Sequence, residues 1–281
     1  MERITFSGQG GLAIVADRAG PVAGLPVVLL HGGGQTRGSW KNGQAALALR
    51  GYNVFSVDAR GHGESAWDPA GDYGLDAQIG DLRALLQQIP PRAAIVGASM
   101  GGVTGLATLG ASDPPDARAL VLVDVTPKLD LAGAERVGAF MRAHMEGFST
   151  IEEVAEAVSA YNPHRPRPKD VSGLRRNLRE IEGRLYWHWD PAFVTERRIS
   201  PGAFQARLEE AARRITIPML LVRGLQSDMV GEAEVAHFRD LAPHAETADV
   251  AGAGHMIAGD RNDAFNAAVI AFLDRVDGRL D

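Results

Sequence analysis

A serine between two glycines is the residue of this chain most clearly suited to covalent chemistry. The segment Gly97–Gly101, with the sequence G-A-S-M-G, places Ser99 just after the apolar run Ala93–Val96. Small residues beside the serine permit a tight turn from a strand into a helix, which exposes the hydroxyl in a strained backbone conformation. The N–H of Met100 would then lie in the first helical turn, free to donate to an anion. The pattern predicts a nucleophilic serine with an oxyanion donor beside it.

A glycine run after another predicted strand could supply the second oxyanion donor. His31 and the glycines 32–34 come directly after the apolar run Val27–Leu30. Glycine lets the backbone approach a ligand closely, so the N–H of Gly33 is the second predicted donor. Losing one such donor typically costs about 10²–10³-fold in rate. Taken alone, the same residues would also fit a plain flexible turn.

An acid and a base follow the last two predicted strands. Asp228 comes after the apolar run Met219–Val222, and His255 comes after Glu246–Val250. His255 would accept the proton of Ser99, while Asp228 would orient His255 and stabilise its charged form. Each could be an ordinary loop residue by itself. Together, beyond the carboxyl ends of predicted strands, where open α/β sheets bind ligands, they predict a Ser-Asp-His triad.

A charged segment after the run Asn53–Val57 has a structural interpretation. The segment Asp58–Ser65 contains a histidine, His62, which could suggest a catalytic role. We interpret it instead as a turn held by Asp58 and Arg60, because short polar side chains stabilise turns by bonding to nearby backbone groups.

Short apolar runs bounded by Gly, Pro or Asp alternate with stretches that can form helices. The predicted strands are Arg3–Phe6, Leu12–Ala16, Val27–Leu30, Asn53–Val57, Ala93–Val96, Ala119–Val123, Met219–Val222 and Glu246–Val250. The predicted helices are Ser39–Arg50, Gly74–Gln88, Gly101–Gly110, Glu232–Leu241 and Ala264–Val276. The alternation predicts an α/β fold with a mostly parallel sheet and helices on both faces. The first two runs predict a hairpin joined around Gly8–Gly11.

One region interrupts this alternation, because no good strand candidate is found between about Thr126 and Ile215. Its helical patterns are Gly133–Gly147, Thr150–Ala160, Val171–Leu185 and Ala203–Arg214. Leu174, Leu178, Ile181 and Leu185 follow a helical spacing and form one apolar stripe. We therefore predict an α/β core in two parts, residues 1–126 and 216–281, with a helical cap over residues 127–215. The proline-rich segment 162–168 is expected to be a stiff loop.

Composition limits the partners and the chemistry. The 281 residues carry a net charge of −6 without a basic tail, which argues against nucleic acid or an anionic membrane as the main partner. There is no cysteine, which excludes thiolate metal sites and suits a reducing cytoplasm. No secretory signal pattern and no apolar run near the roughly 20 residues of a membrane span is present. We expect a cytoplasmic protein, monomeric or homodimeric, that acts on a small molecule.

These motifs resemble the α/β-hydrolase fold superfamily over nearly the whole chain. The resemblance rests on His31–Gly33, Arg60–Ser65, Gly97–Gly102, Ser227-Asp228 and Gly254-His255. It implies an eight-stranded sheet whose second strand is antiparallel and a helical cap after strand six. It also implies the triad Ser99, Asp228 and His255, with an oxyanion hole at Gly33 and Met100. The resemblance also implies that dehalogenases and epoxide hydrolases of this fold have an aspartate at the position of Ser99. The serine therefore argues against these two classes.

Asp124 is an alternative acid for the triad. It follows the run Ala119–Val123, a position where some members of this fold carry the acid. It could replace or assist Asp228, or anchor the cap. We favour Asp228, because a Ser-Asp pair after strand seven is the usual position in the family.

We therefore predict a metal- and cofactor-independent serine hydrolase of the esterase, lactonase or carbon–carbon hydrolase type, cleaving a small apolar ester or lactone through an acyl-enzyme. An amide or carbon–carbon bond hydrolase, or a perhydrolase, on the same triad is the chemical alternative. A non-catalytic ligand sensor is the alternative of another class. The predicted pocket residues are Gly32, Trp187, Trp189, Met229 and Met256.

Overall fold

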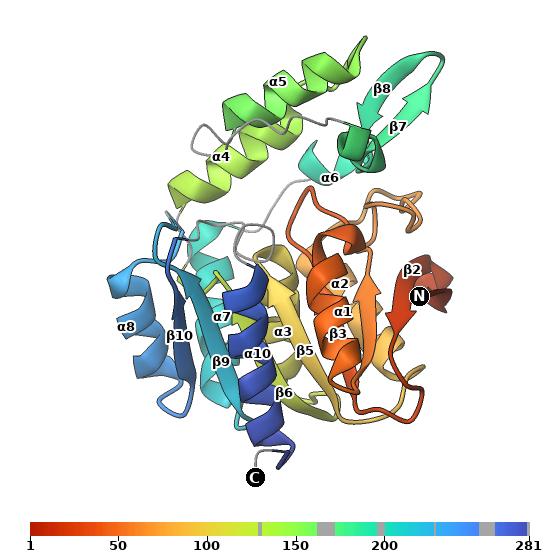
Figure 1. Ribbon diagram of the computed structural model, residues 1–281. Helices are drawn as coiled ribbons and strands as arrows, with labels where there is room; N and C mark the ends of the chain where they lie inside the picture. Colours follow the sequence, from red (N-terminus) through yellow and green to blue (C-terminus); the bar gives the residue numbers. More distant parts are fainter. Residues whose placement is uncertain (129–130, 162–171, 196–199, 228, 253–261, 280–281) are drawn as a thin grey trace.

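One eight-stranded sheet forms the core of the computed structural model, in the order β1-β2-β4-β3-β5-β6-β9-β10 (Figure 1). The strands are β1 Glu2–Ser7, β2 Ala13–Ala19, β3 Pro26–Leu30, β4 Asn53–Val57, β5 Ala93–Ala98, β6 Ala117–Val123, β9 Met219–Gly224 and β10 Glu246–Val250. Strand β2 is antiparallel to β1 and β4, and the other neighbours are parallel. The structure describes residues 1–128, 131–161, 172–195, 200–227, 229–252 and 262–279. The sheet predicted from the sequence is confirmed.

Helices cover both faces of this sheet. Helices α1 (Lys41–Leu49) and α10 (Asn262–Val276) share one apolar cluster with the sheet, which includes Trp40, Phe265 and Phe272. The other face is covered by α2 (Leu75–Leu86), α3 (Met100–Leu109), α7 (Pro201–Arg214) and α8 (Glu232–Leu241). The central strands are apolar on both sides because both sides are packed against helices.

A second group of elements lies over the carboxyl ends of the strands (Figure 1). It consists of α4 (Leu131–Arg142), α5 (Ile151–Tyr161), η3 (Ser172–Asn177), β7 (Leu178–Ile181), β8 (Arg184–Trp187) and α6 (Pro191–Thr195). Their buried side chains form a separate cluster that includes Met141, Phe148, Trp187 and Trp189. We call this group the cap.

The helix predicted over Val171–Leu185 is wrong. The structure has the single 3-10 segment η3 followed by the antiparallel hairpin β7–β8. Its turn consists of Glu182 and Gly183, which adopt φ angles of 51° and 79°. Positive φ at both central residues is the geometry of the tight hairpin turn that matches strand twist, and it is incompatible with a helix.

Helix α7 confirms the helical pattern predicted over Ala203–Arg214, but its side chains pack against the core. Leu208 and Ala212 are fully buried in the same cluster as α2, α3 and α8. An added Cβ at Gly110, after α3, would lie 2.4 Å from the Ala211 Cα. The helix therefore covers the sheet, although it falls within residues 127–215 of the predicted cap.

Candidate active site

Ser99 occupies the sharp turn between β5 and α3. Its backbone has φ 46° and ψ −114°, a conformation that is costly for a residue with a side chain. A Cβ at Gly97 would lie 2.4 Å from the Gly101 carbonyl oxygen, and one at Gly101 would lie 2.4 Å from the Leu30 carbonyl oxygen. Both glycines are therefore required for the close packing of the turn. The predicted elbow geometry is confirmed, and Ser99 stays partly exposed.

The segment 31–35, here called the oxyanion loop, runs beside this elbow. The Gly101 N–H donates to the His31 carbonyl oxygen over 3.1 Å, and a Cβ at Gly32 would lie 3.4 Å from the Ser99 Cβ. Within the described part of the chain, neither the Gly33 N–H nor the Met100 N–H donates to a protein acceptor. Both predicted donors can therefore serve a substrate oxygen.

The orientation of the Gly33 N–H is set by the opposite end of its own peptide group. The Gly32 carbonyl oxygen accepts from His31 Nδ1–H at 2.8 Å and from the Gln35 N–H at 3.1 Å. In a trans peptide the N–H points away from the preceding carbonyl, so two donors on that oxygen fix where the Gly33 N–H points. His31 Nε2 accepts from the Ala59 N–H at 3.0 Å, which requires the proton to be on Nδ1.

The charged turn after β4 is structural, as predicted. Asp58 is fully buried and accepts from the backbone N–H groups of Arg37 and Glu64, at 2.6 and 2.9 Å. Arg60 forms a two-pronged contact with Asp81, at 2.6 and 2.8 Å. Arg60 is 3% exposed, so its guanidinium is shielded from water. A buried charge of this kind needs a paired partner, which Asp81 supplies.

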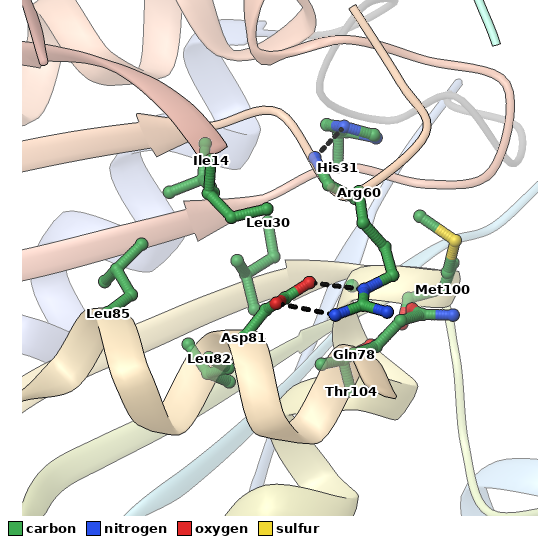
Figure 2. Close-up of a pocket in the computed structure, with 13 residues that line it drawn as sticks. Ile14, Leu30, His31, Arg60, Gln78, Asp81, Leu82, Leu85, Met100 and Thr104 are labelled. Atoms are coloured by element: carbon green, nitrogen blue, oxygen red, sulfur yellow. Dashed lines mark hydrogen bonds and ion pairs between the residues drawn. The ribbon is translucent and has the colours of Figure 1, made fainter. Parts of the chain in front are cut away.

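A small cavity of about 40 Å³ lies behind the elbow, between α2, α3 and the sheet (Figure 2). Its wall includes Leu30, Met100 and Gly101, and Figure 2 shows the Arg60 guanidinium facing the Asp81 carboxylate there. None of the predicted pocket residues that the structure describes lines it, and neither does Ser99. The cavity has room for a water molecule.

Asp124 is buried at the end of β6, with φ 51°. Its Oδ2 accepts from Ser227 Oγ at 2.5 Å, and its Oδ1 accepts from the Gly224 N–H at 3.4 Å. Ser227 Oγ in turn accepts from the Met229 N–H at 3.0 Å. Asp124 therefore holds Gly224 and Ser227, which follow β9. Asp228 itself, like His255 and Met256, lies outside the described residues, so the triad stays a prediction.

Trp187 and Trp189 pack inside the cap. Their rings stack at a centroid separation of 4.9 Å with 12° between their planes, and both residues are buried. Met229 is partly buried at the end of the sheet. The sequence did not suggest Met141, which approaches the oxyanion loop with its sulfur 3.4 Å from the Cβ position of Gly34. The position of Met141 in a predicted cap helix gave no indication of that contact.

Two further histidines join His31 in a buried row that the sequence analysis did not identify. The ring of His62 lies 5.3 Å from that of His31 and 5.7 Å from that of His188. Burial lowers the pKa of His31 and lowers that of His62 still further, and it lowers the pKa of His188 to about 4. All three are neutral near pH 7. Among the described residues, no group of three metal-ligating side chains is found.

The comparisons with known proteins agree with this architecture. A model of the alpha/beta hydrolase family matches residues 27–268, and the chain belongs to that family. Esterase Rv0045c of Mycobacterium tuberculosis is 31% identical over 261 residues, covering 88% of this chain and 82% of that protein. The 3-hydroxybutyrate-oligomer hydrolase of Cupriavidus necator is 30% identical over 245 residues, covering 82% and 83%.

Among solved structures, E-2-(acetamidomethylene)succinate hydrolase superposes with a TM-score of 0.83 at 23% identity, covering 97% of this chain and 100% of that one. This likeness concerns the fold. The predicted family, fold class and enzyme class, an α/β-hydrolase, are confirmed. Within the described residues, no helix is long and apolar enough to cross a membrane.

Proposed function

We propose that this chain is a serine hydrolase that cleaves a carboxylic ester or lactone through an acyl-enzyme. The observation that carries the proposal is the elbow at Ser99 beside two backbone donors, Gly33 and Met100, which have no protein acceptor among the described residues. The relatives named above include an esterase and an oligomer hydrolase, which supports ester chemistry.

The proposed reaction uses each group in turn. Ser99 Oγ attacks the substrate carbonyl carbon, and its proton passes to His255. The carbonyl oxygen becomes negative and is held by the Gly33 and Met100 N–H groups. His255 then protonates the leaving alcohol, and water, activated by the same histidine, releases the acid and regenerates Ser99. Asp228 orients His255 throughout.

A small apolar substrate fits the surroundings of the oxyanion loop. The Met141 sulfur lies 3.7 Å from the Cβ position of Gly33, and Met100 packs against the aromatic cluster of the cap. Thioether side chains form soft apolar walls. We therefore propose a small-molecule partner, and we assign Gly32, Trp187, Trp189, Met229 and Met256 to its pocket. The absence of cysteine in the sequence supports a cytoplasmic location, which cell fractionation would test.

The test is a panel of p-nitrophenyl esters from acetate to octanoate, together with simple lactones, assayed with the wild-type protein and Ser99→Ala. We expect turnover of at least one short or medium ester, and a loss of at least about 10³-fold in Ser99→Ala. Turnover that survives in Ser99→Ala would contradict the proposal. Saturable binding of these compounds with no turnover by the wild-type protein would favour the ligand-sensor class.

A further inference from the structure

A buried histidine of the cap donates a hydrogen bond to the oxyanion loop. His188 lies between β8 and α6 and is 2% exposed. Its Nδ1 accepts from the Gly63 N–H at 2.8 Å, so the ring proton must be on Nε2. That Nε2–H donates to the Gly34 carbonyl oxygen at 3.2 Å. A cap residue thereby bonds directly to the residue that follows the predicted donor Gly33.

Gly34 is held at both of its backbone polar groups by imidazoles. Its N–H donates to His62 Nε2 at 3.2 Å, from the core, and its carbonyl accepts from His188, from the cap. Gly34 has φ 72°, a left-handed conformation that glycine adopts without steric cost. Burial lowers the pKa of His188 to about 4, so near pH 7 the ring keeps one donor and one acceptor.

The contact is transmitted to the Gly33 N–H by peptide geometry. The Gly34 carbonyl and the Gln35 N–H belong to one planar peptide group. The Gln35 N–H donates to the Gly32 carbonyl, which shares its own peptide plane with the Gly33 N–H. A hydrogen bond that fixes the Gly34 carbonyl therefore also fixes the Gln35 N–H. The Gln35 N–H in turn holds the Gly32 carbonyl, and so orients the Gly33 N–H two peptide planes away.

We propose that His188 is a positioning residue, through which the cap holds the oxyanion loop in the geometry that ester hydrolysis requires. This inference rests on the function proposed above. A donor displaced by a fraction of an ångström stabilises the developing oxyanion less well, while substrate in the ground state is bound almost equally. The loss should therefore appear in kcat rather than in KM.

The test variant is His188→Phe, which keeps an aromatic ring and removes both hydrogen bonds. Its matched control is Tyr73→Phe, which removes the hydrogen bond that Tyr73 donates to Asp190, two residues from His188, and the one that it accepts from the Asp68 N–H. Neither of these contacts involves the oxyanion loop. Both are assayed with the best ester of the panel and with the trifluoromethyl ketone of the same acyl group. That ketone forms a tetrahedral oxyanion on the serine.

We expect His188→Phe to lower kcat about ten- to a hundredfold with KM within about twofold, and to weaken ketone binding by the same factor. Tyr73→Phe should leave kcat and ketone binding within about twofold. His188→Gln, which offers one donor and one acceptor, should recover part of the lost kcat. Wild-type kcat and ketone affinity in His188→Phe would overturn the inference, as would an equal loss in Tyr73→Phe.

If His188→Phe does not fold, His188→Leu, which also removes both hydrogen bonds, carries the comparison. Reduced kcat with weakened ketone binding supports the inference, and wild-type values for both overturn it. A wild-type protein that hydrolyses no ester and binds no ketone refutes the proposed function itself. That result is distinct from an active wild-type enzyme that is indifferent to the change at residue 188.

Discussion

Two non-glycine residues with a strained backbone lie at the candidate site. Ser99 and Asp124, each directly after a buried parallel strand, both adopt a positive φ, at 46° and 51°. Such conformations cost about 1–3 kcal/mol and persist where the surrounding structure enforces them. The strands β5 and β6 are neighbours, so the two strained residues end adjacent strands at the edge where the site lies.

The two candidate acids should differ sharply when each is changed to asparagine. Asp228→Asn should lower kcat by about 10²–10⁴-fold, because the histidine loses its orienting carboxylate. Asp124→Asn weakens the contact to Ser227 that holds the turn, so we expect a loss of about tenfold or less with a lower Tm. Steady-state kinetics and thermal melts distinguish the two, and the opposite ranking would make Asp124 the triad acid.

At the level of single residues the sequence predicted the elbow but not the row of histidines. A serine flanked by glycines identifies its own geometry, because few other turns need that pattern. His188 carries no such local signal: its partners, Gly34 and Gly63, are far away in the chain and are reached only after folding. The sequence offers no spacing rule for a contact of that kind.

At the scale of elements, the failure to predict the β7–β8 hairpin has a definite cause. Leu174, Leu178, Ile181 and Leu185 fit a helical repeat, and that spacing dominated the prediction. The competing signal was short: Glu182-Gly183 as a turn, followed by alternating exposed and buried residues from Arg184 to Trp187. Short strands and helix segments are hard to separate by periodicity, and here the glycine turn decided the outcome.

The elbow glycines provide an element-scale prediction. Gly101→Ala would place a Cβ 2.4 Å from the Leu30 backbone oxygen, so we expect a loss of at least about 2 kcal/mol in the free energy of unfolding. The matched control is Gly202→Ala in α7, where an added Cβ meets nothing within 4 Å. That change should be neutral or stabilising by up to about 1 kcal/mol. Urea unfolding measures both, and equal stability of the two variants would contradict this account of the turn.

At the scale of the whole molecule, the cap contacts the core along the segment 60–73 as well as at the oxyanion loop. The Asp190 N–H donates to the Gly61 carbonyl at 2.8 Å, and Arg179 donates to the Gly63 carbonyl at 3.2 Å. Figure 1 shows the cap elements standing over the strand ends. The strands of the sheet followed from the sequence because apolar runs and glycine turns are local signals. The points of attachment are long-range contacts and did not.

The buried histidines predict how stability depends on pH. His31, His62 and His188 have pKa values lowered by burial, so the unfolded chain binds more protons than the folded one below about pH 6.5. Their contribution is complete above that pH and is lost as the pH falls toward 4, by up to about 1.4 kcal/mol per pH unit for each histidine.

Urea unfolding at pH 7.5, 6.0 and 5.0 measures this slope before most carboxylates titrate. We expect the free energy of unfolding to fall on acidification, and His188→Phe to make the slope shallower. A stability that does not change over this range, or a slope that His188→Phe does not alter, would show that the folded protein accepts protons on these rings.

The central claim is that Ser99 is an activated nucleophile. Intact-protein mass after brief exposure to a fluorophosphonate tests it most directly, with Ser99→Ala treated alongside. We predict one stable phosphonyl adduct on the wild-type protein and none on Ser99→Ala. An unmodified wild-type protein, or the same adduct on both proteins, would contradict the claim.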